Sequence, residues 1–244
     1  MSARPRFGVV LDCDGTLTPK SLGSFFKVVD MRALPPEAEP DFKVLRDRYL
    51  PLAAASSLSP ELQLEWLAET FEIYIRHKLT RAGWMEALAR AIVWRHGAIE
   101  TLAALHFFRV PVGIISYGSS DFIRHALVLA GADEWVKEIY ATRMHHDRDG
   151  LVVGYDRDTF VTQDNKGEWS RRFAEAHGIP LDNLLAVGDT AGDRHLGHLK
   201  ENRFGIAMDE AEREKIASYM GTTVVADDFS AARAWLADKL GLPL

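Results

Sequence analysis

Cysteine is almost absent from this 244-residue sequence, which has one, Cys13. A single cysteine excludes an intrachain disulfide and fits a reducing compartment. No apolar run reaches the roughly 18 residues that are needed to span a bilayer. The basic start of the chain precedes too short an apolar stretch for a secretion signal. We therefore expect a cytoplasmic protein with no membrane partner.

Positive charge is also scarce, because 29 Lys and Arg residues stand against 35 Asp and Glu residues and leave a net charge of −6. A nucleic-acid surface needs a basic excess, so we expect no nucleic-acid partner. Small phosphorylated molecules stay compatible with this charge, since a metal ion and a few local cations can offset an acidic whole. Internal repeats and low-complexity tails are lacking as well.

What the sequence does contain is an alternation of short apolar runs and amphipathic stretches. The apolar runs predict strands at 7–12, 110–116, 183–189, 203–208 and 222–226. A further pair, 138–144 and 151–160, predicts a hairpin around a turn at 145–150. Helices that each end in glycine are predicted at 120–131, 166–178, 209–221 and 228–241. This order is typical of α/β proteins, so we expect a Rossmann-like, doubly wound parallel sheet.

Residues 20–108 break this rhythm, because they are helical throughout except for a proline-rich stretch at 33–40. Ser59 caps the clearest of these helices, and Pro60 occupies its first turn. We expect a helical cap, residues 20–108, inserted into a catalytic core that consists of residues 1–19 and 109–244. Three tryptophans of the cap fit its interior or a homodimer contact, so monomer and homodimer both stay open: Trp66, Trp84 and Trp94.

Two carboxylates stand one residue apart at the end of the first predicted strand, in the sequence Asp12-Cys13-Asp14-Gly15-Thr16. Alternation along a strand directs Asp12 and Asp14 to the same side. Neighbouring carboxylates repel, and one keeps its proton unless a cation lies between them. Oxygen ligands suit a hard divalent ion such as Mg²⁺. A turn or a helix cap is the alternative, and we favour the metal site.

Three further signals follow later strands, at the edge where open α/β sheets bind ligands. Ser116 ends the second predicted strand, and Gly118 lets the backbone approach an anion, although a plain helix cap fits as well. Lys166 begins a helix, where a positive charge is unfavourable unless it binds an anion. Taken alone, Lys166 is more simply interpreted as a solvated lysine. Asp189 and Asp193 lie four apart after a strand, which favours metal ligation over an acidic cap.

In this order the four signals resemble the haloacid dehalogenase superfamily. Its pattern is Asp-x-Asp-Gly-Thr, then Ser or Thr after the second strand, then Lys, then Gly-Asp-x-x-x-Asp. The resemblance covers the core, residues 7–17 and 109–226. The second acid of the first motif marks the phosphatases of that superfamily, and a helical insertion right after it resembles the phosphoserine-phosphatase-like branch. A fainter resemblance, in the cap and around Lys166, is to the pyrimidine 5′-nucleotidase branch.

The resemblance implies a Mg²⁺-dependent phosphomonoester hydrolase that acts on a small phosphorylated metabolite. Asp12 would be the nucleophile that forms an aspartyl phosphate, and Asp14 would act as acid and then base. Ser116 and Lys166 would bind the phosphoryl oxygens.

The same resemblance implies a set of ligands for Mg²⁺. They would be Asp12, the backbone carbonyl of Asp14, Asp189 and, through water, Asp193. The remaining residues expected to bind the substrate are Gly15, Thr16, Tyr117 and Gly118.

Three other functions stay open. They are a nucleotide phosphatase of the pyrimidine 5′-nucleotidase kind, a phosphotransferase that passes the phosphoryl group to another acceptor, and an inactive scaffold of the same fold. Intact acidic and lysine positions argue against the scaffold, and a large cap argues against nucleic-acid or protein substrates.

Specificity is expected to come from the cap. Its candidates, each of which taken alone is more simply interpreted as a solvated or a core residue, are Arg46, Arg48, Tyr74, Arg76, His77, Lys78, Trp94 and Arg95. Two histidine pairs are interpreted as structural: His145 and His146 in a predicted turn with Asp147, and His195 and His198 on a predicted helix. Cys13 is expected in the core.

Overall fold

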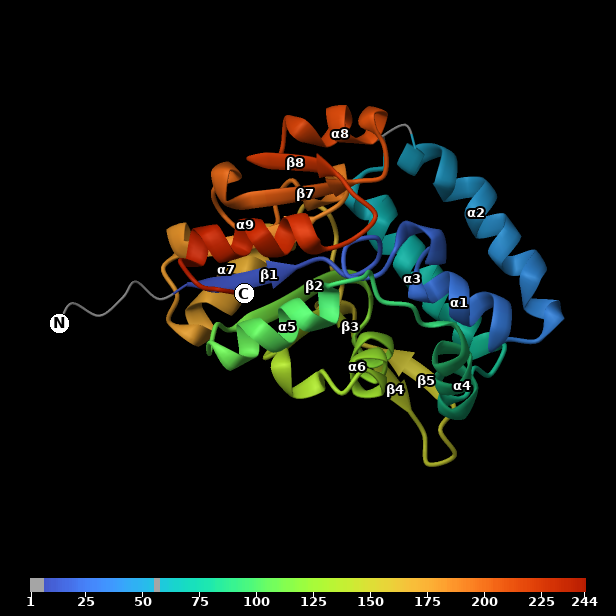
Figure 1. Cartoon of the computed structure of the whole chain (residues 1–244). Coiled ribbons are helices and arrows are strands. Elements are labelled where there is room, and N and C mark those ends of the chain that lie inside the picture. Colours follow the sequence, from blue (N-terminus) through green and yellow to red (C-terminus); the bar gives the residue numbers. More distant parts are fainter. Residues whose placement is uncertain (1–6, 55–57) are drawn as a thin grey trace.

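The computed structural model describes residues 7–54 and 58–244. Its centre is a six-stranded sheet in the order β3-β2-β1-β6-β7-β8, in which every neighbouring pair is parallel (Figure 1). The strands are β1 Gly8–Leu11, β2 Val112–Ser119, β3 Glu138–Thr142, β6 Leu184–Gly188, β7 Arg203–Ala207 and β8 Thr222–Val225. The predicted α/β class, a Rossmann-like doubly wound parallel sheet, is confirmed.

Helices cover both faces of this sheet. They are α5 Ala98–Phe107, α6 Ser120–Leu129, α7 Lys166–His177, α8 Glu210–Ala217 and α9 Ser230–Leu240. Alternate residues of β1 serve the two faces: Val9 lies in the apolar cluster that contains Leu102 of α5 and Leu236 of α9, whereas Val10 lies in the cluster that contains Phe173 of α7. Burial on both faces explains why β1 is a continuous apolar run.

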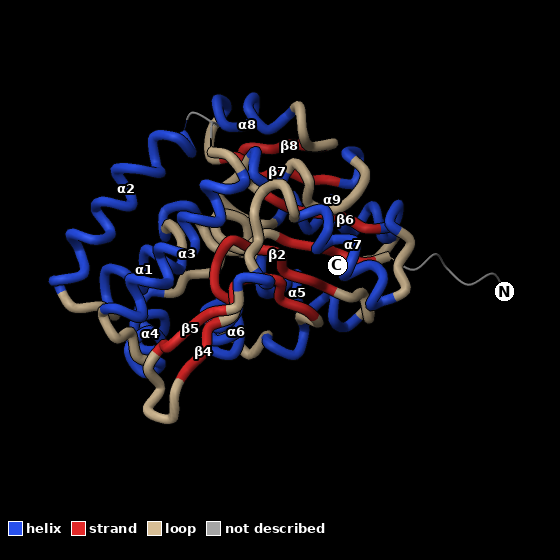
Figure 2. The backbone as a smooth tube through the Cα atoms, turned by 180° about the vertical axis from the view of Figure 1, so that it is seen from behind, coloured by secondary structure: helices blue, strands red, loops and turns tan. Residues whose placement is uncertain are grey.

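Four helices and a hairpin lie beyond the carboxyl ends of the strands, on one side of the sheet (Figure 2). The helices are α1 Phe25–Arg32, α2 Glu39–Ala54, α3 Pro60–Arg76 and α4 Arg81–Ala91, and the hairpin joins β4 Met144–His146 to β5 Val152–Tyr155. Backbone hydrogen bonds attach the hairpin to the loop before α4: the Arg81 N–H donates to the Gly150 carbonyl at 2.7 Å, and the Val152 N–H donates to the Leu79 carbonyl at 2.9 Å.

Three sequence-based element predictions are wrong. The predicted strand 151–160 is too long, because β5 ends at Tyr155 and residues Arg157–Thr159 form a short 3-10 helix. The segment 138–144 is not one strand, because the residues after β3 bond to side chains: the Arg143 N–H donates to Thr159 Oγ1 and the Met144 N–H to Asp121 Oδ2, both at 3.0 Å. Residues 195–198 are not helical. Gly197 has a φ of +72° there, and Arg203 donates to two carbonyls of this turn, those of residues 196 and 198.

Helix α5 bears on the boundary between cap and core. It packs against β2 and α9, and its Leu102 and Leu105 are fully buried in the main core. The expected cap, residues 20–108, includes this helix. We propose that the core resumes near Gly97, at the start of α5.

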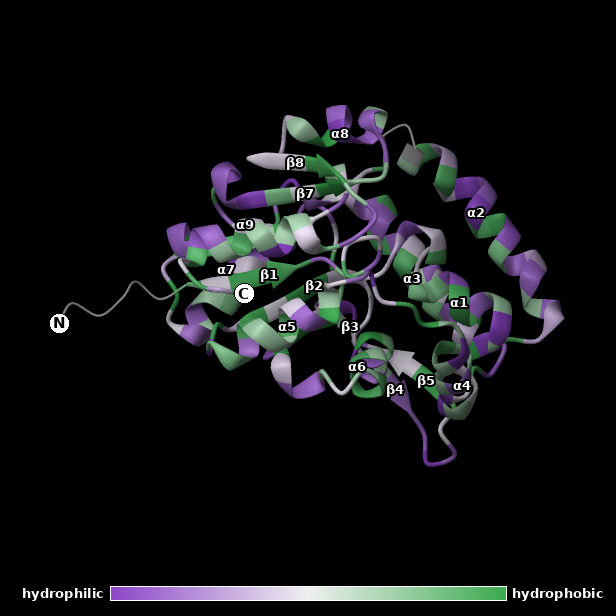
Figure 3. Ribbon diagram, in the orientation of Figure 1, coloured by the Kyte–Doolittle hydropathy of each residue, from purple (hydrophilic) through white to green (hydrophobic). Residues whose placement is uncertain are grey.

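Hydrophobic residues gather on the central strands and the inward sides of the helices, whereas α2 and α8 carry many hydrophilic residues (Figure 3). Within residues 7–54 and 58–244, no helix combines the length and the apolar character that a membrane crossing requires.

Candidate active site

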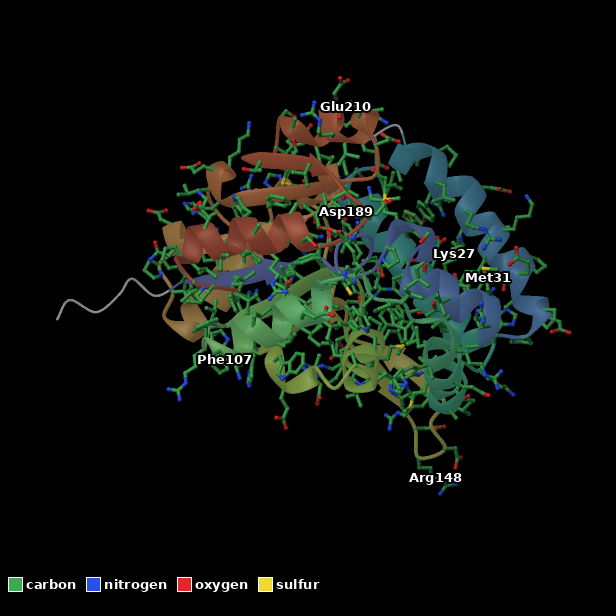
Figure 4. All side chains as sticks on the ribbon, viewed as in Figure 1. Lys27, Met31, Phe107, Arg148, Asp189 and Glu210 are labelled. Atoms are coloured by element: carbon green, nitrogen blue, oxygen red, sulfur yellow. The ribbon has the colours of Figure 1, made fainter. Side chains whose placement is uncertain are left out.

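The carboxyl ends of β1, β2 and β6 and the start of α7 meet at one point. Asp12 directly follows β1, and its N–H donates to the Val187 carbonyl of β6 at 3.0 Å, so the two strands stay in register beyond the end of β1. Asp189 directly follows β6 and lies between the strand ends and the cap helices (Figure 4). The edge expected to bind the ligand is therefore where the predicted acids lie.

Lys166 is the first residue of α7, and its side chain turns inward between two acids. Its Nζ lies 2.8 Å from Asp12 Oδ1 and 2.6 Å from Asp193 Oδ1. All three side chains are buried, and Lys166 is only 1% exposed. The two carboxylates keep the pKa of Lys166 well above its usual range despite its burial. A buried, permanently charged ammonium beside a carboxylate is an anion-binding group, and the structure thus excludes a solvated lysine.

Asp193 is held by the chain that follows β6. It ends the short helix η6 Ala191–Asp193, where its Oδ2 accepts hydrogen bonds from the N–H of Asp189 at 3.0 Å and of Thr190 at 3.1 Å. A side chain on Gly188 would meet Asp193, since its Cβ would lie 2.5 Å from the Asp193 Cγ. This contact gives a physical reason for the glycine of the Gly-Asp-x-x-x-Asp pattern.

The structure brings three of the predicted metal ligands together. Asp12, Asp189 and Asp193 each offer a carboxylate oxygen, and these three atoms lie within 4.8 Å of one another. Burial raises the pKa of Asp12 to about 8 against the opposing charge of Lys166. Burial also raises the pKa of Asp189 to about 6. Three crowded, desolvated carboxylates carry more negative charge than the ammonium of Lys166 offsets, so a hard divalent cation with oxygen ligands fits this cluster.

The carboxylate of Asp14 is not part of this cluster. Its Oδ1 accepts a hydrogen bond from the Phe25 N–H at 3.2 Å, which ties it to the start of α1. Burial, with a further contribution from Asp12, raises the pKa of Asp14 to about 7. A carboxyl group that holds its proton near neutral pH can serve as a general acid.

The residues predicted along β2 lie at the same site. Ser116 is 2% exposed, and its Oγ accepts a hydrogen bond from the Gly118 N–H at 3.1 Å. The Tyr117 ring lies against Lys166, with Nζ 4.8 Å from the ring centroid. β2 extends to Ser119, three residues past its expected end, and its register against β3 shifts after Ile115. The irregular stretch is the one that carries these polar residues.

Gly15 has a φ of +82°, and a Cβ there would collide with Asp189 Oδ2. We expect Gly15→Ala to lower the free energy of unfolding by more than about 1 kcal/mol and to weaken Mg²⁺ binding. Gly131→Ala is the matched control, because Gly131 has a φ of +66° with nothing within 4 Å of its Cβ position. Urea unfolding and calorimetric Mg²⁺ titration of both variants check this. An equal loss of metal binding in both would contradict the local collision.

Most of the cap candidates contact acidic side chains of the cap. Arg46 pairs with Glu39, Arg48 with Glu65 and Glu69, and both Arg76 and His77 with Asp41, while buried Tyr74 donates to Asp30 at 2.8 Å. Lys78 is exposed, and Trp94 is half-buried. Arg95 has the structural role that was the alternative for each candidate, because it is 2% exposed and donates to the backbone carbonyls of Gly15, Thr16 and Ala226.

The histidines singled out in the sequence and Cys13 have contacts that are typical of structural residues. His145 lies 2.6 Å from Asp156, and His146 accepts a hydrogen bond from the Trp84 indole at 3.4 Å. His195 contacts Arg194 at 3.2 Å. Cys13 is fully buried in the main core, and its burial next to two acids keeps its pKa well above the usual range.

Two groups hold Asp189, and sequence reasoning missed one of them, Lys20. Thr16, which is predicted to bind substrate, donates from Oγ1 to Asp189 Oδ1 at 3.0 Å. Lys20 lies 3.1 Å from Asp189 Oδ2. The sequence carried no signal for Lys20, because a lysine beside a proline in a loop is usually solvated.

Comparisons with known proteins agree with this geometry. A family model for haloacid dehalogenase-like hydrolases matches residues 9–198, whereas no curated protein sequence matches. The structure of cytosolic 5′-nucleotidase IIIB bound to cytidine is similar, with a TM-score of 0.77 and 20% identity over 97% of this chain and 86% of that one. A substrate-bound phosphoserine phosphatase has a TM-score of 0.68 and 18% identity over 96% of this chain and 99% of its own.

A third solved structure, a phospho-aspartyl intermediate analogue of phosphoserine phosphatase, has a TM-score of 0.67 and 18% identity over 95% of this chain and 99% of that one. At such identities the structural likeness shows the fold, while the family model covers most of the chain. The chain belongs to the haloacid dehalogenase-like hydrolases.

Proposed function

We propose that this protein is a Mg²⁺-dependent phosphomonoester hydrolase for a small phosphorylated metabolite, working through an aspartyl phosphate on Asp12. The observation that carries the proposal is the buried Lys166 between Asp12 and Asp193, with Asp189 in the same cluster of oxygen ligands. A hydrolase of this family needs a nucleophile, an anion-binding cation and a metal site within a few ångströms, and these residues supply all three.

The chain's own residues have separate tasks in binding. Lys166 and Ser116 would hold equatorial phosphoryl oxygens, where negative charge accumulates in the transition state. Tyr117 and Gly118 would line the phosphate loop. Asp12, Asp189, the Asp14 carbonyl and, through water, Asp193 would hold Mg²⁺. The bound cation supplies charge neutralisation between the phosphate and the nucleophile.

The chemistry then follows from two carboxyl groups with different neighbours: Lys166 and bound Mg²⁺ would keep Asp12 ionised, whereas the Asp14 carboxyl group lies outside the metal cluster and would keep its proton. An oxygen of Asp12 attacks phosphorus in line, and the bond from phosphorus to the leaving oxygen breaks. Asp14 gives its proton to that leaving oxygen, in keeping with its raised pKa of about 7. Asp14, now a carboxylate, takes a proton from the water that attacks the aspartyl phosphate. Inorganic phosphate leaves, and both carboxyl groups return to their starting states.

Nucleotides are the second candidate substrate class. Aromatic side chains of the cap and core form a cluster beside the loop that follows Asp14, in which the Phe26 ring lies 5.7 Å from Phe71, 6.2 Å from Tyr74 and 6.1 Å from Phe122. Phe71, Tyr74 and Phe122 are fully buried, so of these four rings it is the half-buried Phe26 that could contact a flat, apolar group. The similar fold of a 5′-nucleotidase bound to cytidine favours the same class.

The test is phosphate release from a panel of substrates with Mg²⁺, in EDTA, and after Mg²⁺ is restored. The panel contains an aryl phosphate, nucleoside monophosphates, phosphoserine, phosphocholine and sugar phosphates. We expect release that EDTA stops and Mg²⁺ restores. Added alcohols or nucleosides show whether the phosphoryl group passes to acceptors other than water. Folded protein that is silent on the whole panel would instead favour an inactive scaffold.

A further inference from the structure

Lys20 connects the first motif, the metal cluster and α8. It begins the short helix η1 Lys20–Leu22, at the start of the expected cap. Its Nζ lies 3.1 Å from Asp189 Oδ2, 3.3 Å from the Asp189 carbonyl oxygen and 2.8 Å from Glu212 Oε2. The side chain is 21% exposed, so this ion pair is largely shielded from water. Lys20 therefore contributes positive charge directly at a carboxylate of the metal cluster.

Both oxygens of Asp189 already have donors. Thr16 Oγ1 donates to Oδ1 at 3.0 Å, and Lys20 occupies Oδ2. A cation bound to this carboxylate would meet the ammonium of Lys20 at close range, and two positive charges repel. Glu212 offers Lys20 a second acceptor on the far side, and it is fixed in place because its Oε2 also accepts the Met208 N–H at 3.0 Å.

We propose that Lys20 is a built-in competitor of the divalent cation at Asp189. Its ammonium neutralises Asp189 in the metal-free protein and moves fully to Glu212 when the metal binds. The inference rests on the metal site of the proposed function, but it concerns the affinity of that site and not the reaction. Lys20 stabilises the metal-free fold, and the same contact weakens metal binding.

Mg²⁺ binding, measured by calorimetry without substrate, tests this. We expect Lys20→Met to bind Mg²⁺ about tenfold more tightly than wild type, because a neighbouring positive charge is gone. Lys27→Met is the matched control: Lys27 is an exposed lysine of α1, and its substitution removes the same charge without touching Asp189 (Figure 4). The Mg²⁺ affinity of this control should stay within about twofold of wild type, since solvent screens exposed charges.

Substitution of Glu212 should change the Mg²⁺ affinity in the opposite direction. Glu212→Gln leaves Lys20 with Asp189 as its charged partner, so we expect Mg²⁺ binding about threefold weaker than wild type. Glu210→Gln removes the same charge from α8, where Glu210 pairs with Arg213, and should leave the affinity unchanged. The double variant Lys20→Met with Glu212→Gln should match Lys20→Met alone, because Glu212 acts only through Lys20.

Thermal unfolding separates competition from a merely structural role. Lys20→Met should melt at a lower temperature than wild type in EDTA, and saturating Mg²⁺ should close most of that gap. A gap of equal size in both conditions would overturn the proposal, as would unchanged or weaker Mg²⁺ binding in Lys20→Met. Equal tightening in Lys27→Met would also overturn it. If wild type releases phosphate from a phosphomonoester with Mg²⁺ while Lys20→Met binds Mg²⁺ no more tightly, the competition by Lys20 is rejected and the proposed function stands.

Discussion

Asp12→Asn should lower the rate of phosphate release by at least about 1000-fold, because an amide cannot attack phosphorus to form the aspartyl phosphate. The substitution keeps the size of the side chain. Its amide oxygen can still accept a hydrogen bond from Lys166, whose Nζ lies 2.8 Å from Asp12 Oδ1 in wild type. The loss should therefore appear in kcat more than in KM. Steady-state phosphate release at saturating Mg²⁺ measures it, together with circular dichroism to show that the fold is kept.

A matched change at an exposed position gives the control. Asp149 lies in the turn between β4 and β5, and its side chain is 73% exposed, so Asp149→Asn should leave kcat unchanged. Asp12→Asn should also fail to form an acid-stable phosphoenzyme when labelled substrate is quenched in acid. Turnover that survives in Asp12→Asn would mean that another residue is the nucleophile, and the mechanism proposed from this site would be wrong.

The fold was predictable because its strongest signals are local. β1 reads as a continuous apolar run that ends in acid, since Val9 and Val10 face opposite buried sides of the sheet before Asp12 leaves it. The polar residues that follow β1, β2 and β6 were predicted to meet, because parallel strands end at one edge. Asp193 joined them through the same rule, whereas Lys166, which alone was interpreted as a solvated lysine, was assigned to the site through the resemblance to the family pattern.

The errors concern contacts between residues far apart in the chain. Arg95 was one of the specificity candidates in the expected cap. Its guanidinium instead donates to the Gly15 and Thr16 carbonyls, which lie 80 and 79 residues earlier in the sequence. The break between β3 and β4 depends on Asp121 and Thr159, which accept backbone hydrogen bonds across the fold. No periodicity in a short window can encode such partners.

Lys20 fails to stand out for the same reason. Its two acidic partners, Asp189 and Glu212, come 169 and 192 residues later. Thr16 was placed at the site by its motif, yet its contact with Asp189 spans 173 residues and is visible only in the folded chain. Sequence patterns therefore identified the groups that are proposed to do the chemistry, while the groups that hold them in position required the structure.

The second large effect is expected at Asp14, and it should depend on the leaving group. Asp14→Asn removes the proton that the leaving oxygen receives, so we expect release of phosphate from an alkyl phosphomonoester to fall about 10²- to 10⁴-fold. A nitrophenolate leaves without protonation, so the first step with nitrophenyl phosphate should slow far less. The amide of this variant also cannot take a proton from the attacking water, so the aspartyl phosphate should break down slowly with either substrate.

These two consequences give a kinetic signature that separates acid–base chemistry from binding. Rapid mixing of Asp14→Asn with nitrophenyl phosphate should give a burst of about one nitrophenolate per site, followed by slow turnover. Asp12→Asn should give no burst, because it forms no intermediate. Because Asp14 Oδ1 accepts the Phe25 N–H at 3.2 Å and an amide oxygen can do the same, the start of α1 should keep its place. An equal loss for both leaving groups, without a burst, would make Asp14 a residue that positions the cap and would assign the proton transfer elsewhere.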